Sequence, residues 1–133
     1  MRADPQTERE IFIAVDAFLD HLAGCRSDEA LACFVPDGDA ALYGSEVSEN
    51  IVGPTALRTF FEKLLSRATG PRFSLAQRRA SIAGNVAWFT SEAEVQIGEM
   101  RVAPYRLSGV LEKRDGRWLW ALFSGSEPLP DRG

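Results

Sequence analysis

The hydrophobic period of this chain changes once, near Gly70-Pro71. Before that point apolar residues recur three or four positions apart, which is the spacing of one face of a helix. After it they alternate with polar residues, as along a half-buried strand. Helices followed by an unbroken run of strands predict an α+β domain, with the helices packed on one face of a curved, mainly antiparallel sheet.

Three helices are expected in the first half. The first follows a capping box in which the Thr7 side chain accepts from the backbone N–H of Glu10 while Glu10 reaches back, and it ends at Gly24. The second is short, with Ser27 as its cap. The third begins with Pro54 at its first position and carries a clean amphipathic stripe.

A short strand over residues 40–43 precedes the third helix, and four longer strands follow it. We place the long strands at residues 73–83, 86–97, 100–113 and 117–124. The pairs between them, Gly84-Asn85, Gly98-Glu99 and Asp115-Gly116, are typical of two-residue hairpin turns. Neither a linker nor a repeat divides the chain, so residues 1–133 are expected to form one domain with a core from about residue 8 to 127.

Composition narrows the range of partners. The 133 residues carry a net charge of −4, which argues against nucleic acid because phosphate binding needs a basic surface. No apolar run is long enough to cross a membrane, and the first residues lack the apolar stretch of a secretory signal, so we expect a cytoplasmic protein. A single histidine, His21, and no paired cysteine spacing leave no metal site, and no cofactor is expected.

Two-residue turns decide which side chains share a face of the sheet. If Gly98-Glu99 is the turn, Ser91 lies opposite Arg106 and Phe89 lies opposite Ser108. The next turn adds Phe123 to the same face. We therefore expect these five side chains to look toward the helices and to line a pocket there.

The opposite face would carry four large aromatic residues, which are Trp88, Tyr105, Trp118 and Trp120. Three helices cover only one face, and large apolar patches rarely stay exposed on monomers. We therefore predict a homodimer joined through this face. A light-scattering mass equal to one chain at micromolar concentration would contradict it. The alternative is that the C-terminal tail, residues 128–133, covers the tryptophans.

Two stretches resemble the SnoaL-like branch of the nuclear transport factor 2-like superfamily. They are Leu-Ala-Cys-Phe-Val-Pro-Asp at residues 31–37 and Pro-Tyr-Arg-Leu-Ser-Gly-Val-Leu-Glu-Lys-Arg-Asp-Gly-Arg-Trp at residues 104–118. The resemblance implies a cystatin-like cone, as in ketosteroid isomerase, with a pocket between the helices and the curved sheet. Members include ketosteroid isomerase, polyketide cyclases, scytalone dehydratase and pure binding or scaffold domains, and they are often dimers.

The resemblance also indicates where a steroid isomerase would hold its catalytic groups. The position of its strand-borne aspartic acid falls on Arg106, that of its helix tyrosine near Ala17 or Phe18, and that of its carboxylate base among residues 41–43. None of these positions holds the required group. Double-bond isomerisation by that route is therefore not expected.

Arg106 is the residue on which the predicted site depends. A guanidinium facing a pocket of low dielectric must be paired, because an unpaired buried charge is costly. One interpretation is an internal partner, for which Asp16, Asp20 and Glu127 are candidates. The other is an anchor for a carboxylate or enolate of a ligand, with the two neighbouring serines as further donors.

Four further residues are candidate proton carriers: Asp16, Asp20, His21 and Tyr43. For the first three, the interpretation we favour is a solvent-facing helix edge. Tyr43 is also a candidate ligand-binding hydroxyl at the mouth of the pocket, and the alternative is a half-buried strand tyrosine. Three functions follow. The leading one is a protein that binds a small acidic or carbonyl molecule in an apolar pocket. The alternatives are a metal-free isomerase, cyclase or dehydratase acting on a small cyclic substrate, and a dimeric scaffold domain with a filled core.

Overall fold

The computed structural model describes residues 1–99 and 101–132. Its elements are α1 (Pro5–Ala23), α2 (Ser27–Ala32), β1 (Ala41–Tyr43), β2 (Asn50–Val52), α3 (Pro54–Leu64), β3 (Arg72–Ala83), β4 (Val86–Ile97), β5 (Arg101–Arg114) and β6 (Arg117–Ser126). The predicted order of three helices and a late antiparallel meander is confirmed. The short strand β2 was not predicted, and Met100, the expected first residue of β5, lies outside the described residues.

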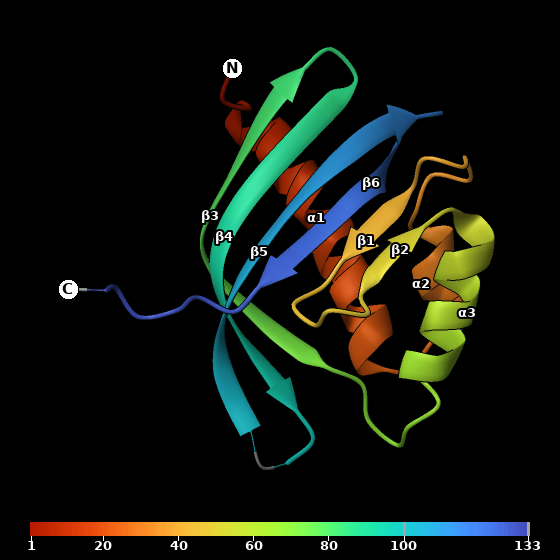
Figure 1. Ribbon diagram of the computed structural model, residues 1–133. Coiled ribbons are helices and arrows are strands. Elements are labelled where there is room, and N and C mark those ends of the chain that lie inside the picture. Colours follow the sequence, from red (N-terminus) through yellow and green to blue (C-terminus); the bar gives the residue numbers. More distant parts are fainter. Residues whose placement is uncertain (100, 133) are drawn as a thin grey trace.

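The six strands form one sheet in the order β2-β1-β6-β5-β4-β3. Strands β1 and β6 pair in parallel, and the other neighbours are antiparallel. In Figure 1 the sheet curls in front of α1, while α2 and α3 stand beside β1 and β2. The predicted α+β architecture is therefore confirmed. Within the described residues, no helix is both long and apolar enough to cross a membrane.

The first helix starts one turn earlier than predicted. Asp4 is its N-cap, and the Asp4 carboxylate accepts from the backbone N–H of Thr7 at 2.9 Å and from the Thr7 hydroxyl at 3.0 Å. Pro5 then occupies the first helical position, where its missing N–H is harmless. The expected cap at Ser27 is also wrong. The N-cap of α2 is Arg26, without a side-chain cap bond, and Ser27 is already helical.

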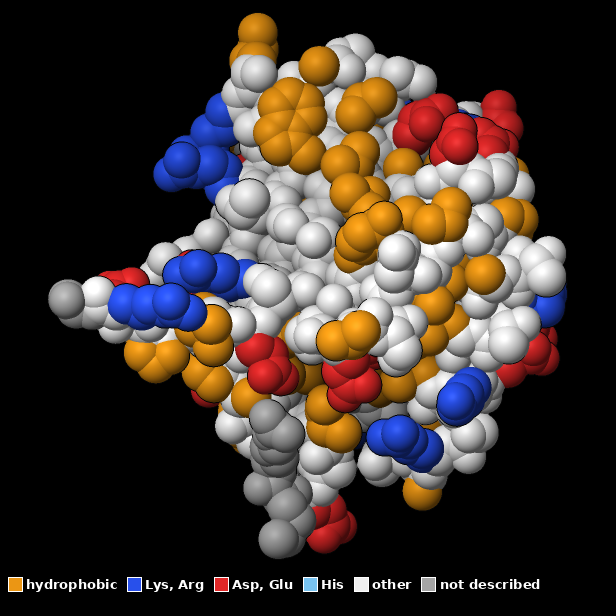
Figure 2. Space-filling model, viewed as in Figure 1, with side chains coloured by type: hydrophobic (Ala, Val, Ile, Leu, Met, Phe, Trp, Pro, Cys, Tyr) orange, Lys and Arg blue, Asp and Glu red, His pale blue; other side chains and the backbone are white. Residues whose placement is uncertain are grey.

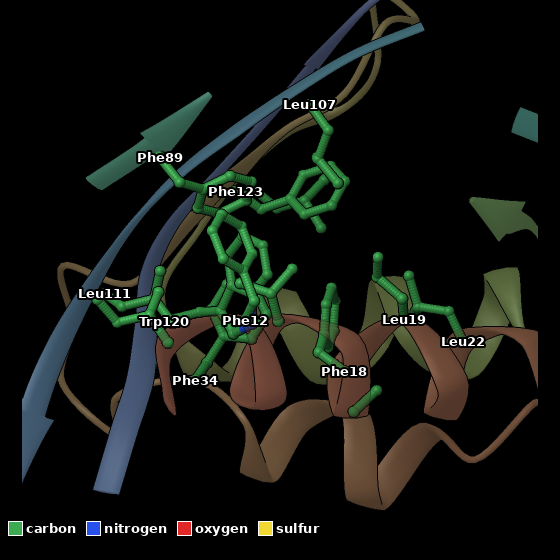
Figure 3. Packing of buried hydrophobic residues seen from close by; sticks show 14 of the residues in the cluster. Phe12, Phe18, Leu19, Leu22, Phe34, Phe89, Leu107, Leu111, Trp120 and Phe123 are labelled. Carbon is green, nitrogen blue, oxygen red and sulfur yellow. The ribbon is translucent and has the colours of Figure 1, made fainter. Parts of the chain in front are cut away.

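An aromatic cluster between α1 and the sheet forms the core (Figure 3). The Phe18 ring lies 5.1 Å from that of Trp120, and the Phe12 ring 5.5 Å from that of Phe89, both measured between centroids. Gly109 makes this packing possible. A Cβ there would stand 2.5 Å from the Trp120 ring and 2.9 Å from the Phe89 ring, closer than real contacts allow. These rings fill the deep part of the cone.

The turn between β4 and β5 is longer than predicted. Ile97 pairs with Arg101, one residue farther along the chain than a two-residue turn would place its partner. Because side chains alternate along a strand, one extra residue exchanges the two faces of β5. Tyr105 therefore points toward the helices, and Arg106 and Ser108 point away from them. The predicted faces of β5 are wrong for this reason.

The turn between β5 and β6 has the predicted two residues, but the pairing shifts farther along. Leu111 pairs with Trp120, and after a bulge Val110 pairs with Leu122. Because Leu111 now faces the helices, its partner Trp120 faces them too and is fully buried. The bulge then reverses the alternation, so Phe123 still faces inward. Phe123 therefore lies on the expected face, while Trp120 does not.

Candidate functional site

A cavity of about 180 Å³ lies at the end of the cone where the β1–β2 loop approaches the beginning of β3. Its apolar wall comes from α3, β3, β4 and β6, and the aromatic members of that wall are Phe60, Phe61, Phe73 and Phe123. The volume is below the roughly 300–1,000 Å³ of pockets for drug-sized ligands. It is close to the ~150 Å³ of an engineered cavity that binds benzene. The space therefore suits a molecule of about one ring.

Tyr105 is the buried polar residue of this cavity. It lies on the inner face of β5, is only 6% exposed, and its ring centroid is 5.3 Å from that of Phe73. The ring reaches across to β6, where Gly125 leaves room for it. A Cβ at position 125 would overlap the Tyr105 hydroxyl. The glycine thus permits the position of the phenol.

The electrostatic surroundings keep this phenol protonated. Burial raises the pKa of Tyr105 to about 12, while a hydrogen bond with Ser45 acts in the opposite direction. The carboxylates of Glu49 and Glu127 raise the pKa further, because a phenolate beside them would be repelled. At neutral pH the Tyr105 hydroxyl can therefore both donate and accept a hydrogen bond.

Three carboxylates line the cavity, those of Glu46, Glu49 and Glu127. The Glu49 carboxylate accepts from the backbone N–H of Glu46 at 3.0 Å, and the Glu49 carbonyl accepts from the N–H of Gly44 at 2.8 Å. These bonds hold the β1–β2 loop over the cavity. Arg67 is the one cation among the described residues that line it. The polar part of the cavity is thus mainly acidic.

A larger groove of about 930 Å³ adjoins the cavity along α3 and β2. Its lining residues are mostly exposed, including Pro54, Thr55 and Val52. The two share part of the β1–β2 loop and Arg67. Because the buried hydroxyl lies in the smaller space, we take the cavity as the candidate site and the groove as its outer approach.

The predicted Arg106 anchor is wrong. The Arg106 Nε atom lies 3.1 Å from a carboxylate oxygen of Glu92 on the outer face, and the two side chains are 60% and 50% exposed. Its partner is thus Glu92 and none of the three internal carboxylates considered. Ser108 also faces outward, where both residues line a separate groove of about 400 Å³. A pair this exposed contributes at most about 1 kcal/mol.

The other predicted pocket residues divide between core and cavity. Phe123 lines the cavity, so a role in binding stays a prediction for it. Phe89 faces inward but packs deeper, between Phe12 and Trp120. Ser91 also faces inward, but its hydroxyl donates to the carbonyl of Leu107 at 2.8 Å. Neither Phe89 nor Ser91 lines the cavity.

None of the predicted proton carriers lines the cavity either; these are Asp16, Asp20, His21 and Tyr43. The Asp16 carboxylate accepts from Arg78 at 2.8 Å. The His21 Nδ1 atom accepts from the Nε of Arg26 at 2.9 Å. Asp20 is exposed. Tyr43 is 48% exposed and is the last residue of β1, which pairs in parallel with β6. The structure therefore brings together a different set, Tyr105 with the loop glutamates.

The outer sheet face differs from the one predicted for the homodimer. Tyr105 and Trp120 are buried on the inner side, and Trp118 is partly buried against the core. Trp88 remains outside at 41% exposure, in a cross-strand row with Val110 and Leu122. Apolar side chains gather on this face in Figure 2, and the C-terminal tail extends away from the sheet in Figure 1. The homodimer stays a proposal, with this row as its contact.

The raised pKa of Tyr105 predicts a loss of stability in alkali. A free tyrosine ionises near pH 10, and Tyr105 in the folded chain near 12. Between these values the unfolded chain has lost a proton that the folded chain keeps, so stability falls by about 1.4 kcal/mol per pH unit. Tyr105→Phe removes this fall. Urea denaturation of both proteins at several pH values measures it, and parallel stability curves would contradict it.

The variant is needed as a reference because other groups titrate in the same range. Burial also raises the pKa of the Cys33 thiol, to about 11. That contribution is common to both proteins and cancels in the difference between them.

The SnoaL-like domain family matches residues 11–130 of the chain. Among solved structures, a nuclear transport factor 2-like protein of unknown function from Pseudomonas putida is 17% identical, with a TM-score of 0.80 over 97% of this chain and 92% of that one. A candidate dehydratase of the same fold family from Streptomyces avermitilis is 13% identical, with a TM-score of 0.84 over 96% and 100%.

A third solved structure, a protein of unknown function with a cystatin-like fold from Nostoc punctiforme, is 21% identical, with a TM-score of 0.77 over 96% of each chain. Identities this low establish a common fold. The search of curated proteins finds no match. Because the family match spans most of the chain, and the sheet with its three helices agrees with the fold of these solved structures, this chain belongs to the SnoaL-like domain family.

Proposed function

We propose that this SnoaL-like chain binds a small organic molecule of about one ring in the cavity beside Tyr105. The observation that carries the proposal is the cavity itself. Aromatic and aliphatic side chains surround about 180 Å³ of space, and a buried hydroxyl faces it. Ligand pockets typically combine an apolar wall with a few polar groups that orient the ligand.

The polar contact in this proposal is Tyr105. Arg106 faces away from the cavity, so the reason for expecting an acidic ligand no longer holds. The protonated Tyr105 hydroxyl can donate to a carbonyl or exchange hydrogen bonds with a hydroxyl group. Tyr105 can therefore orient a ring that bears a carbonyl or a hydroxyl group.

The alternative of a scaffold with a filled core applies only to the deep part of the cone. There Phe18, Phe89 and Trp120 are fully buried. Nearer the mouth the walls diverge, and the space between α3 and β4 is left open. A binding function accounts for that opening, and a filled core does not.

A matched pair of variants tests the proposal with benzyl alcohol as the probe. Val95 is buried and lines the cavity, whereas Val102 is 58% exposed on the same hairpin. We expect benzyl alcohol to bind with a Kd on the order of 0.1–1 mM, as fits a ligand of this size. Val95→Phe fills the cavity and should weaken binding about tenfold or more, while Val102→Phe should not. Ligand-observed NMR measures both.

Circular dichroism and thermal unfolding of the two variants show whether each is folded. A folded Val95→Phe protein that binds benzyl alcohol as tightly as the original chain would exclude this cavity as the binding site. The absence of saturable binding of any small ring would contradict the function itself.

A second candidate function is metal-free proton transfer, as in an isomerase or dehydratase. Tyr105 and Glu49 line the same cavity, and the Glu49 carboxylate acts electrostatically on the Tyr105 hydroxyl. In such a reaction the hydroxyl would donate to a carbonyl oxygen while the carboxylate takes a proton from the neighbouring carbon. One of the solved structures with this fold is a candidate dehydratase, which is compatible with this chemistry.

Hydrogen–deuterium exchange beside the carbonyl of cyclohexanone tests this second candidate. In heavy water the chain should accelerate the exchange above the rate in buffer. Glu49→Gln should lower that acceleration about a hundredfold, which is within the usual range for general acid–base catalysis. Arg106→Ala, on the outer face, should leave it unchanged. Exchange no faster than in buffer would leave binding as the function.

A further inference from the structure

We propose that the cavity selects a cation, and that its ligand is a protonated amine carried on a single ring or a group of similar size. This inference rests on the proposed function, because it assigns a charge to the ligand of the same site. It reverses the charge expected from Arg106. Three features of the cavity favour a cation: the loop carboxylates, the aromatic wall and the Tyr105 phenol.

Among the described residues, the carboxylates of the β1–β2 loop, those of Glu46 and Glu49, have no basic partner. Within the described residues, neither Glu46 nor Glu49 lies within 4.0 Å of a lysine, arginine or histidine nitrogen. The Glu49 carboxylate accepts a hydrogen bond from the backbone N–H of Glu46. An ionised carboxylate can accept about four hydrogen bonds. Glu49 is half-buried, and it therefore keeps acceptor sites for a ligand beside an apolar wall.

The wall favours the same charge. The Tyr105 and Phe73 rings lie 5.3 Å apart and the Phe73 and Phe123 rings 6.3 Å apart, so three aromatic rings adjoin one another along the cavity. The faces of such rings carry negative potential, and they attract ammonium groups. An anionic ligand would be repelled by the carboxylates, and it would gain nothing from the faces of the rings.

The phenol completes the set of acceptors. An ammonium group has three N–H donors and no acceptor. The protonated Tyr105 hydroxyl has a free lone pair even while it shares a hydrogen bond with Ser45. A ring that sits between the aromatic side chains can thus direct its ammonium group toward Tyr105 and Glu49, which already interact electrostatically.

Arg67 is the one opposing charge among the described lining residues, and it lies at the boundary of the cavity. It lines both the cavity and the adjoining groove, where Lys63 is also found. Its side chain is exposed, so water screens its charge. The Glu49 carboxylate is half-buried and therefore less screened than Arg67, so it contributes more to the potential inside the cavity.

Three probes of similar size separate the possibilities: benzylammonium, benzyl alcohol and benzoate. We expect benzylammonium to bind about tenfold more tightly than benzyl alcohol, and benzoate to bind most weakly. Glu49→Gln should abolish the preference for the ammonium over benzyl alcohol. Glu92→Gln is the matched control, since that carboxylate pairs with Arg106 on the outer face. Isothermal titration calorimetry at neutral pH measures each affinity.

The outcomes distinguish this inference from the function on which it rests. If none of the three probes binds, the proposed function fails. If benzyl alcohol binds as tightly as benzylammonium, or Glu49→Gln leaves their ratio unchanged, only the charge selectivity is overturned. Val95→Phe locates the effect, because it should weaken all three probes. Benzylammonium binding that persists undiminished in this variant would mean attraction to the acidic surface, and would also overturn the inference.

Discussion

The pairing of β4 with β5 is the constraint on which the rest of this structure depends. Ile97 faces Arg101, and every pair along the two strands follows from that contact. The register sends Tyr105 inward and Arg106 outward, and through the next turn it also buries Trp120. A change of one residue would turn the guanidinium of Arg106 toward the buried inner face of the sheet. The stability of the core and the chemistry of the cavity thus have a common origin.

The register also explains why the two ends of the cone differ. Where the sheet packs against Phe12 and Phe18 of α1, aromatic rings contact one another, and the lack of a side chain at Gly109 leaves room for them. Toward the other end the strands diverge from α3, and the β1–β2 loop brings polar groups over the gap. One end of the fold holds the packed aromatic core, and the other leaves a cavity whose charged lining residues are mainly acidic.

The architecture could be predicted because it depends on long patterns. The two hydrophobic periods, one before and one after Gly70-Pro71, each extend over many residues. They indicate helices before strands, whatever the details of each turn. The faces of β5 depend on a single turn, and Gly98 suits either a two-residue or a three-residue loop because its φ is +68°. A physical signal did favour the observed choice. The observed turn buries Tyr105 and Leu107, whereas the predicted turn would bury Arg106 and Ser108. Burying an arginine is costly.

The remaining site residues leave weaker traces in the sequence. Glu46 and Glu49 belong to an irregular loop, where no period indicates which side chains point inward. The bulge in β6 that returns Phe123 to the inner face follows no glycine or proline, so composition does not reveal it. The strand β2 has three residues, too few to show alternation. Positions of this kind are decided by tertiary contacts.

Gly125 shows how two distant positions can share one volume. The phenol of Tyr105 occupies the space that a side chain at position 125 would fill, although the two residues lie on different strands. A relative with a bulkier residue at the second position has to shorten or turn the residue at the first, and with it the reach of any polar group into the cone. Ligand preference across such relatives would then vary with the pair of residues rather than with either one alone.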